Sequence, residues 1–158
     1  MRAIRVAVLT LPAVMWLLAG AQAAAAAPWP VAGGTVLLGY GESYAVGGAV
    51  RTHLGADIAA SDGACVRAPA DATVAFRGSV PAGDGGTALA VSLDLADGRR
   101  VTLMPLADVV VRAGERVSAG DAIAAVAGRG DASCDEPHLH VGLKSGDTYL
   151  DPATMFEG

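Results

Sequence analysis

The chain has 158 residues and a formal net charge of −5, with 11 basic side chains (Lys and Arg) against 16 acidic ones. This length suits a single domain, and the acidic balance argues against nucleic acid as a partner. Apolar residues make up 53% of the chain, but much of that fraction comes from alanine and from the apolar N-terminus, and aromatic residues are few.

The first 27 residues have the pattern of a secretory signal peptide. Residues 1–5 are a short basic start, residues 6–19 are almost wholly apolar, and small residues follow up to position 27. The apolar part is short of the roughly 20 residues that a membrane span needs, although an uncleaved anchor stays open as the alternative. Removal of residues 1–27 takes away two arginines, so the net charge becomes −5 − 2 = −7. We therefore expect a secreted protein of the cell envelope whose residues 28–158 form one domain.

The remaining chain consists of short strand patterns separated by turns, with no long stretch of helical period after residue 30. Residues 96–98 predict a hairpin turn, and Pro105, which has no N–H to donate, is expected to end the strand before it. Short strands with turns about every ten residues predict an all-β, mainly antiparallel sandwich or barrel-like domain. Strands are expected within residues 31–44, 65–76, 89–95, 100–104, 109–117, 118–128, 138–143 and 149–152.

Two of the three histidines lie on one of the last predicted strands, Pro137–Leu143. Because side chains alternate along a strand, His138 and His140 point to one face and the leucine and valine side chains point to the other. This strand therefore offers an apolar face for a core and a pair of imidazoles for a cavity.

The third histidine lies far upstream, in the stretch His53-Leu54-Gly55-Ala56-Asp57. An even step separates His53 from Asp57, so in an extended segment both side chains share a face. His53, Asp57 and His140 offer two nitrogens and one oxygen, which suits a catalytic zinc with one position left for water. His138 would lie beside that water and act as the general base when the water attacks a peptide carbonyl.

The two cysteines of the chain are Cys65 and Cys134. In an exported protein an even pair most often forms a disulfide, so we predict a bridge between them. The alternative, that Cys134 ligates the metal because it is close to His138, stays open, although the spacing is not that of a zinc ribbon.

Together these motifs resemble the lysostaphin/LytM-type zinc metallopeptidases, which cut peptides of bacterial peptidoglycan. The resemblance runs from about residue 31 to residue 156. It implies the all-β fold of that family, of the duplicated hybrid motif kind, and one Zn²⁺ held by His53, Asp57 and His140. It also implies that His138 assists the bound water, that peptidoglycan peptides are the substrate, and that the protein acts as a monomer. The matching motifs are Gly39-Tyr40-Gly41, His53–Ala59, Val66–Val74, Val111–Asp121 and Pro137–Val141.

One segment departs from the family pattern. Active members usually carry another histidine in a Tyr-x-His-Leu-like segment, which corresponds here to Val101-Thr102-Leu103-Met104-Pro105-Leu106. Loss of one such contributor typically costs on the order of 10²–10⁴ in rate. Tyr40, Tyr44 and Arg51 are candidate substitutes, in a loop that we expect to form one wall of the groove, with residues 128–136 as the other.

Three functions stay open on this basis. The first is a secreted zinc endopeptidase acting on peptidoglycan, and the second is a catalytically impaired member that serves as a cell-wall binding or regulatory module. The third is a lipoyl or biotinyl carrier domain, which the repeated turns with glycine and an acidic residue favour. Such a carrier needs a lysine at an exposed hairpin, and Lys144, the one lysine of the chain, has no such setting.

Overall fold

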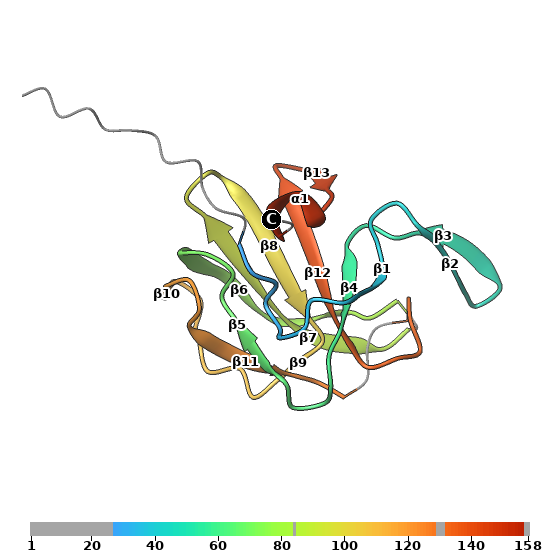
Figure 1. The fold of residues 1–158 in the computed structure, drawn as a ribbon, viewed down its shortest axis with the longest axis horizontal. Helices are drawn as coiled ribbons and strands as arrows, with labels where there is room; N and C mark the ends of the chain where they lie inside the picture. Colours follow the sequence, from blue (N-terminus) through green and yellow to red (C-terminus); the bar gives the residue numbers. More distant parts are fainter. Residues whose placement is uncertain (1–26, 84, 129–131, 157–158) are drawn as a thin grey trace, which may run out of the picture.

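Figure 1 shows the computed structural model, which describes residues 27–83, 85–128 and 132–156. Residues 1–26, and with them nearly all of the predicted signal peptide, lie outside the described residues. In the part of the chain that is described, no helix is both long and apolar enough to cross a membrane. The elements are β1 (Val36–Leu38), β2 (Ser43–Val46), β3 (Ala49–Thr52), β4 (Ala56–Ala59), β5 (Cys65–Arg67), β6 (Ala72–Pro81), β7 (Thr87–Leu95), β8 (Arg99–Met104), β9 (Leu106–Ala107), β10 (Arg116–Val117), β11 (Ala122–Val126), β12 (His138–Ser145), β13 (Thr148–Leu150) and α1 (Ala153–Phe156).

The strands form one large antiparallel sheet, one small sheet and one hairpin. The eight-stranded sheet has the order β1-β4-β12-β8-β7-β6-β10, with β13 paired to β12. Strands β5, β11 and β9 form the three-stranded sheet, and β2 and β3 form a separate hairpin that projects at the right of Figure 1. The prediction of an all-β, mainly antiparallel domain is confirmed.

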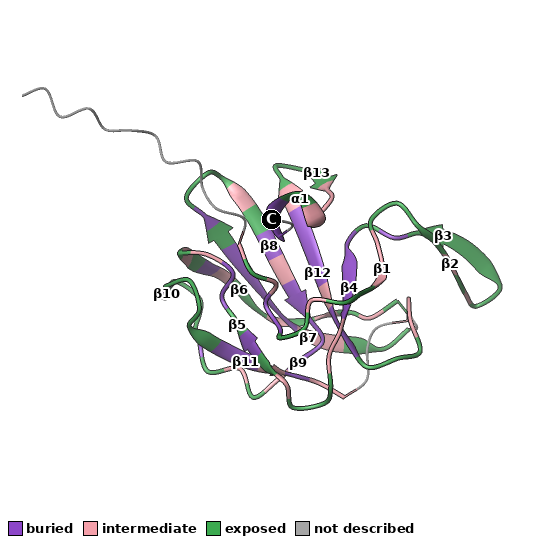
Figure 2. Cartoon of the chain, in the orientation of Figure 1, coloured by how far each residue is buried: buried purple, intermediate pink, exposed green. Residues whose placement is uncertain are grey.

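A single hydrophobic core joins the two larger sheets. On β12, the side chains of Leu139, Val141 and Leu143 are fully buried, as the predicted alternation requires. Val66 and Ile123 of the small sheet belong to the same buried cluster. Figure 2 shows this as buried segments along β12, β4, β7 and β8, with the exposed hairpin β2–β3 outside the core. The core therefore holds β12 and β4 in place, and these two strands carry the predicted site.

The valine run at positions 109–111 differs from the expectation, because it is not a strand. Strand β8 ends before Pro105 as predicted, and β9 follows at once. Strand β9 pairs only with Ala125 and Val126 of β11, and the chain then turns at Asp108, which has a φ of +46°. One hydrogen bond, from Val110 N–H to the Ile123 carbonyl at 3.0 Å, links the valine run to β11, and Val110 is 69% exposed.

The predicted disulfide is not formed in the structure, where Cys65 and Cys134 are both free thiols. Cys65 is exposed on β5, in register with Ala125 of β11, whereas Cys134 lies in the loop before β12. The prediction rested on the number of cysteines and the compartment. A bridge also requires Cα atoms within about 7 Å and converging Cβ vectors, which composition does not provide.

The start of the described chain packs against its end. Trp29 stacks on Phe156 of α1 with ring centroids 4.4 Å apart, and Ala27 N–H donates to the Met155 carbonyl at 3.0 Å. The segment before β1 therefore runs along the body of the domain and covers the side of the core that α1 closes.

Candidate metal centre

The pairing of β4 with β12 brings two of the three predicted ligands, Asp57 and His140, together. His140 lies directly opposite Asp57 in this antiparallel ladder, and His138 lies opposite Ala59. Residues that face each other across a ladder have their side chains on the same side of the sheet. The side chains of Asp57 and His138 are fully buried, and that of His140 is 17% exposed. The centre is therefore embedded in the sheet and opens to solvent beside His140.

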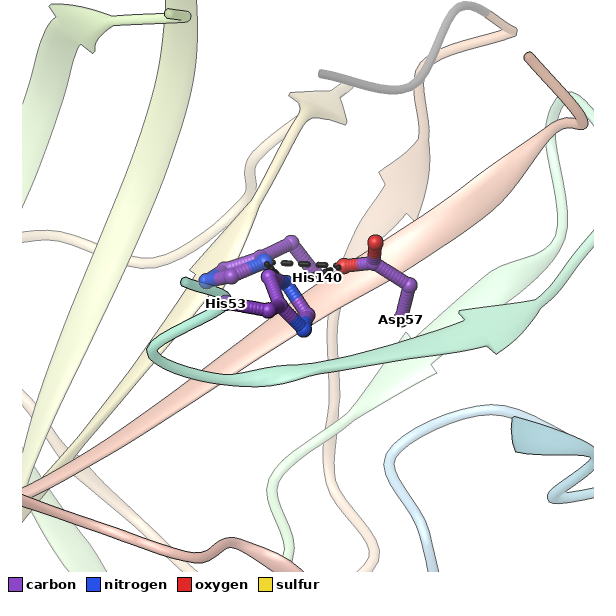
Figure 3. Close-up of side chains that lie close together, drawn as sticks. All are labelled: His53, Asp57 and His140. Atoms are coloured by element: carbon purple, nitrogen blue, oxygen red, sulfur yellow. Dashed lines mark hydrogen bonds and ion pairs between the residues drawn. The ribbon is translucent and has the colours of Figure 1, made fainter. Parts of the chain in front are cut away.

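Figure 3 shows three side chains that converge on one point. His53 Nε2 lies 3.1 Å from Asp57 Oδ1 and 3.1 Å from His140 Nδ1. His140 Nδ1 lies 2.8 Å from the same Asp57 oxygen. His53, Asp57 and His140 are thus a group able to hold a metal ion, as the sequence predicted from their chemistry.

The chain between His53 and Asp57 is not extended, contrary to the expectation. Four residue steps along a strand span about 13 Å, so the 3.1 Å contact requires the chain to turn. It bends at Gly55, between the end of β3 and the start of β4. A Cβ at Gly55 would lie 2.5 Å from His140 Cε1, so only glycine leaves room for the imidazole. The two side chains therefore meet because of a bend rather than a shared strand face.

Hydrogen bonds fix which ring nitrogen each histidine presents. His53 Nδ1 lies 3.1 Å from the Gly39 carbonyl, and His138 Nδ1 lies 2.7 Å from the Glu136 carbonyl. A carbonyl only accepts, so Nδ1 donates in both rings and Nε2 is the nitrogen that each ring presents to the centre. In His53 that nitrogen points at the centre, 3.1 Å from Asp57 Oδ1. In His138 it lies at the edge of the centre, with Nε2 3.7 Å from Asp57 Oδ1.

Asp57 is held in its ionised form. Burial is the largest single influence and raises the pKa of Asp57, whereas hydrogen bonds with His140 and His53 lower it. Coulombic attraction by His140 and a hydrogen bond from Ser133 lower the pKa further, so it lies well below its ordinary value. Ser133 Oγ donates to Asp57 Oδ2 at 2.6 Å, which leaves Oδ1 directed at the two imidazoles.

The donor set fits zinc. Tetrahedral zinc sites hold nitrogen and oxygen ligands at about 2.0–2.2 Å, so two donor atoms on one ion lie roughly 3.3–3.5 Å apart. The three donor–donor distances here, 2.8, 3.1 and 3.1 Å, are close to that spacing. The Gly39 carbonyl behind the His53 ring is also the usual arrangement for an imidazole that holds such a metal.

The segment that lacks the family histidine lies next to this centre. Met104, at the end of β8, is directly opposite His140 on β12, and Pro105 follows it in a buried position. In the Tyr-x-His-Leu pattern, Pro105 takes the position of the histidine and Leu103 that of the tyrosine. The strand beside the centre is thus apolar where the pattern has a second assisting imidazole.

The structure shows the contacts of Tyr40 and Tyr44, two of the residues considered as replacements for the missing histidine. Tyr40 donates from its hydroxyl to the Tyr149 carbonyl at 3.2 Å. Tyr44 stands edge-on to the His53 ring, with centroids 6.0 Å apart and planes at 90°.

Sequence reasoning missed two residues that shape the centre. Gly55 lies inside the His53–Ala59 motif. Its position between two proposed ligands, His53 and Asp57, is the sequence feature that could have indicated a bend there. Ser133 lies in a polar loop with no distinguishing pattern, so nothing in the sequence pointed to its contact with Asp57.

A cavity of about 1030 Å³ lies elsewhere, along the segment that includes Trp29 and beside Arg67 and Pro137. None of the converging side chains lines it. The site is therefore defined by its chemistry and not by this cavity.

Comparisons with known proteins agree with this geometry. The sequence model described as peptidase family M23 matches residues 51–152, more than half of the chain. No similar sequence was found among curated proteins. Among solved structures, the catalytic domain of the antimicrobial peptidase lysostaphin from Staphylococcus simulans is 27% identical, with a TM-score of 0.64. That alignment covers 79% of this chain and 93% of the lysostaphin domain.

Two further structures show the same fold at lower identity. A zinc-containing peptidase from Vibrio cholerae is 23% identical with a TM-score of 0.66, over 80% of this chain and 39% of that one. The chain thus spans about two fifths of the Vibrio protein. The structure titled as the SpoIIQ–SpoIIIAH pore-forming complex is 20% identical with a TM-score of 0.70, over 83% of this chain and 90% of that one.

Proposed function

Because the chain belongs to peptidase family M23, we propose that it is a secreted zinc metalloendopeptidase that hydrolyses peptide bonds of bacterial peptidoglycan. The observation that supports this proposal most strongly is the convergence of His53 Nε2, Asp57 Oδ1 and His140 Nδ1 within 3.1 Å of one another. These three side chains would hold one Zn²⁺. The proposal also draws on the likeness to the lysostaphin domain, which is a peptidase.

The chain's own residues would divide the work as follows. Bound zinc would make water more acidic and would polarise the carbonyl of the scissile bond. His138, whose Nδ1 is held by the Glu136 carbonyl, presents Nε2 as the acceptor for the proton of the attacking water. Ser133 keeps the Asp57 carboxylate oriented, and burial of Asp57 and His138 keeps solvent away from all but the His140 side.

A second candidate function is a catalytically impaired member that binds or regulates the cell wall. Pro105 and Met104 favour it, because neither offers a titratable group beside His140. Whether zinc and His138 suffice for turnover decides between the two candidates.

The test is release of soluble peptides from purified peptidoglycan by the protein without residues 1–27, together with its zinc content. We expect release that a zinc chelator abolishes and that added zinc restores. Stoichiometric bound zinc with no release over a range of wall chemistries would refute the hydrolase and leave the binding module. Release that persists with the chelator would refute the metal mechanism.

A further inference from the structure

The hairpin β2–β3 leads directly into the metal centre. Tyr44 on β2 lies opposite Arg51 on β3, and the ladder continues to His53, whose N–H donates to the Glu42 carbonyl at 2.8 Å. Opposite residues and alternate residues of a ladder share a face. Tyr44, Arg51 and His53 therefore have their side chains on one face of this hairpin.

That face is the one turned toward the body of the domain. Along β2, Tyr44 and Val46 are half-buried, whereas Ser43 and Ala45 are exposed. The contact between the Tyr44 and His53 rings, at a centroid distance of 6.0 Å, continues the same face to the centre. His53, at its end, is 2% exposed. The inner face thus runs from the tip of the hairpin to the proposed ligands.

Arg51 is exposed even though it lies on this inner face. In the described part of the chain no carboxylate forms an ion pair with it, whereas Arg99 and Arg100 pair with Asp97 and Asp94. The acidic side chain at the base of the hairpin, Glu42, accepts a hydrogen bond from Gly39 N–H. Arg51 is therefore an exposed guanidinium two residues before His53, on the same face of the hairpin.

We propose that Arg51 binds a carboxylate of the peptide substrate and so determines which wall peptides the centre accepts. Guanidinium binds carboxylate through two parallel N–H···O bonds, which gives orientation as well as affinity. The substrate class is a peptide with a free carboxylate near the scissile bond, in preference to the same peptide with that carboxylate amidated. This inference rests on the proposed function, because it names the substrate of that centre.

The experiment measures binding separately from cleavage. The zinc-loaded protein is sedimented with purified peptidoglycan and with the same material after amidation of its carboxylates by carbodiimide and ammonium. We expect wild-type protein to bind the untreated material at least about tenfold more tightly, and Arg51→Gln to lose that preference. Arg51→Lys should keep part of it, because an ammonium retains the charge without the two-pronged geometry.

The matched control is Arg116→Gln. Arg116 is also exposed, but it lies on β10, at the opposite edge of the large sheet from β1 and β4. It should keep the wild-type preference, which separates a local contact from a general effect of protein charge. Zinc content should be equal in all four proteins, because Arg51 contacts none of the proposed ligands.

Each result decides the proposal. Equal binding of wild-type protein to both materials, or a preference that survives Arg51→Gln, would overturn it. A preference that depends on Arg51 without any peptide release would support the carboxylate site and refute the hydrolase. Equal peptide release from treated and untreated material would support the hydrolase and overturn the role of Arg51.

Discussion

His140 and Asp57 face each other across the pairing of β12 with β4, and their nearest side-chain atoms, Nδ1 and Oδ1, are 2.8 Å apart. A directly opposed pair holds its Cβ atoms at about 5 Å, so the sheet sets the spacing of these two side chains. His53 reaches the same point from the end of the hairpin, through the bend at Gly55. The sheet therefore fixes Asp57 and His140 relative to each other, whereas the position of His53 depends on the short bend at Gly55.

Removing each imidazole of β12 should have different effects. His140→Ala removes a proposed ligand, so zinc affinity should fall by at least about 100-fold, and peptide release should fall with it. His138→Ala should change zinc affinity only a few-fold, yet reduce turnover by about 10²–10⁴. Competition with a chromophoric chelator measures the first quantity. Similar zinc affinities for the two variants would contradict this division of roles.

Ser133 should act on zinc affinity through Asp57. Without its hydrogen bond to Oδ2, the carboxylate can rotate and Oδ1 is less well directed. We expect Ser133→Ala to weaken zinc binding by about 10–100-fold and Ser133→Thr to restore most of it. Ser145→Ala, at the exposed far end of β12, is the control and should bind zinc like wild type.

Gly55→Ala should displace the His140 ring. The new Cβ would lie 2.5 Å from Cε1 and 2.7 Å from the Val141 carbonyl, so the ring or the backbone must move. Zinc affinity should fall at least tenfold, and the midpoint of urea unfolding should fall as well. Gly142→Ala is the matched control on β12, since its nearest neighbours lie at 3.9 Å, an ordinary contact distance. If both variants bind zinc normally, the close approach at Gly55 has no functional consequence.

The metal-free protein should lose stability in acid partly through Asp57. The pKa of Asp57 is lower in the folded state than the 3.8 of the free side chain. A group whose pKa is lowered on folding stabilises the protein above its unfolded pKa, and this contribution is lost as the pH falls below about 4. Urea unfolding of wild type and Asp57→Asn should therefore show a gap at pH 6 that narrows toward pH 3. A gap that stays constant would contradict the linkage.

Pro105→His tests whether the apolar strand beside the centre limits turnover. The variant supplies an imidazole where the Tyr-x-His-Leu pattern has one. We expect peptide release to rise by about tenfold or more at unchanged zinc content, whereas Pro105→Ala should stay at the wild-type rate. If Pro105→His changes nothing while wild type is already active, the second imidazole is not needed in this chain.

The fold and the centre were predictable to different degrees. Alternation in β12 predicted both the buried face of Leu139 and the shared face of His138 and His140, because a period of two is a local property. The valine run at 109–111 was wrongly assigned to a strand, because the chain turns at Asp108 and the run meets β11 through one hydrogen bond, from Val110 to Ile123. Such pairing is decided by residues distant in sequence, which no local pattern records.

The same distinction applies within the centre. The ligand chemistry of His53, Asp57 and His140 was visible in the sequence, although His53 and Asp57 meet through the bend at Gly55 and not along an extended segment. The roles of Ser133 and Gly55 depend on side chains about 80 residues away in the chain, at Asp57 and His140, so only the folded arrangement reveals them. The disulfide between Cys65 and Cys134 failed for the reverse reason, because composition alone was used where geometry decides.

The alternation along β12 also limits how this protein can change over evolutionary time. One face of the strand packs into the core through Leu139 and Val141, and the other carries His138 and His140 of the proposed site. Substitutions can adjust either face one side chain at a time. A single inserted or deleted codon within the strand would exchange the two faces at once, placing imidazoles in the interior and leucine at the metal. Variation in this segment should therefore proceed by replacement and never by change of length.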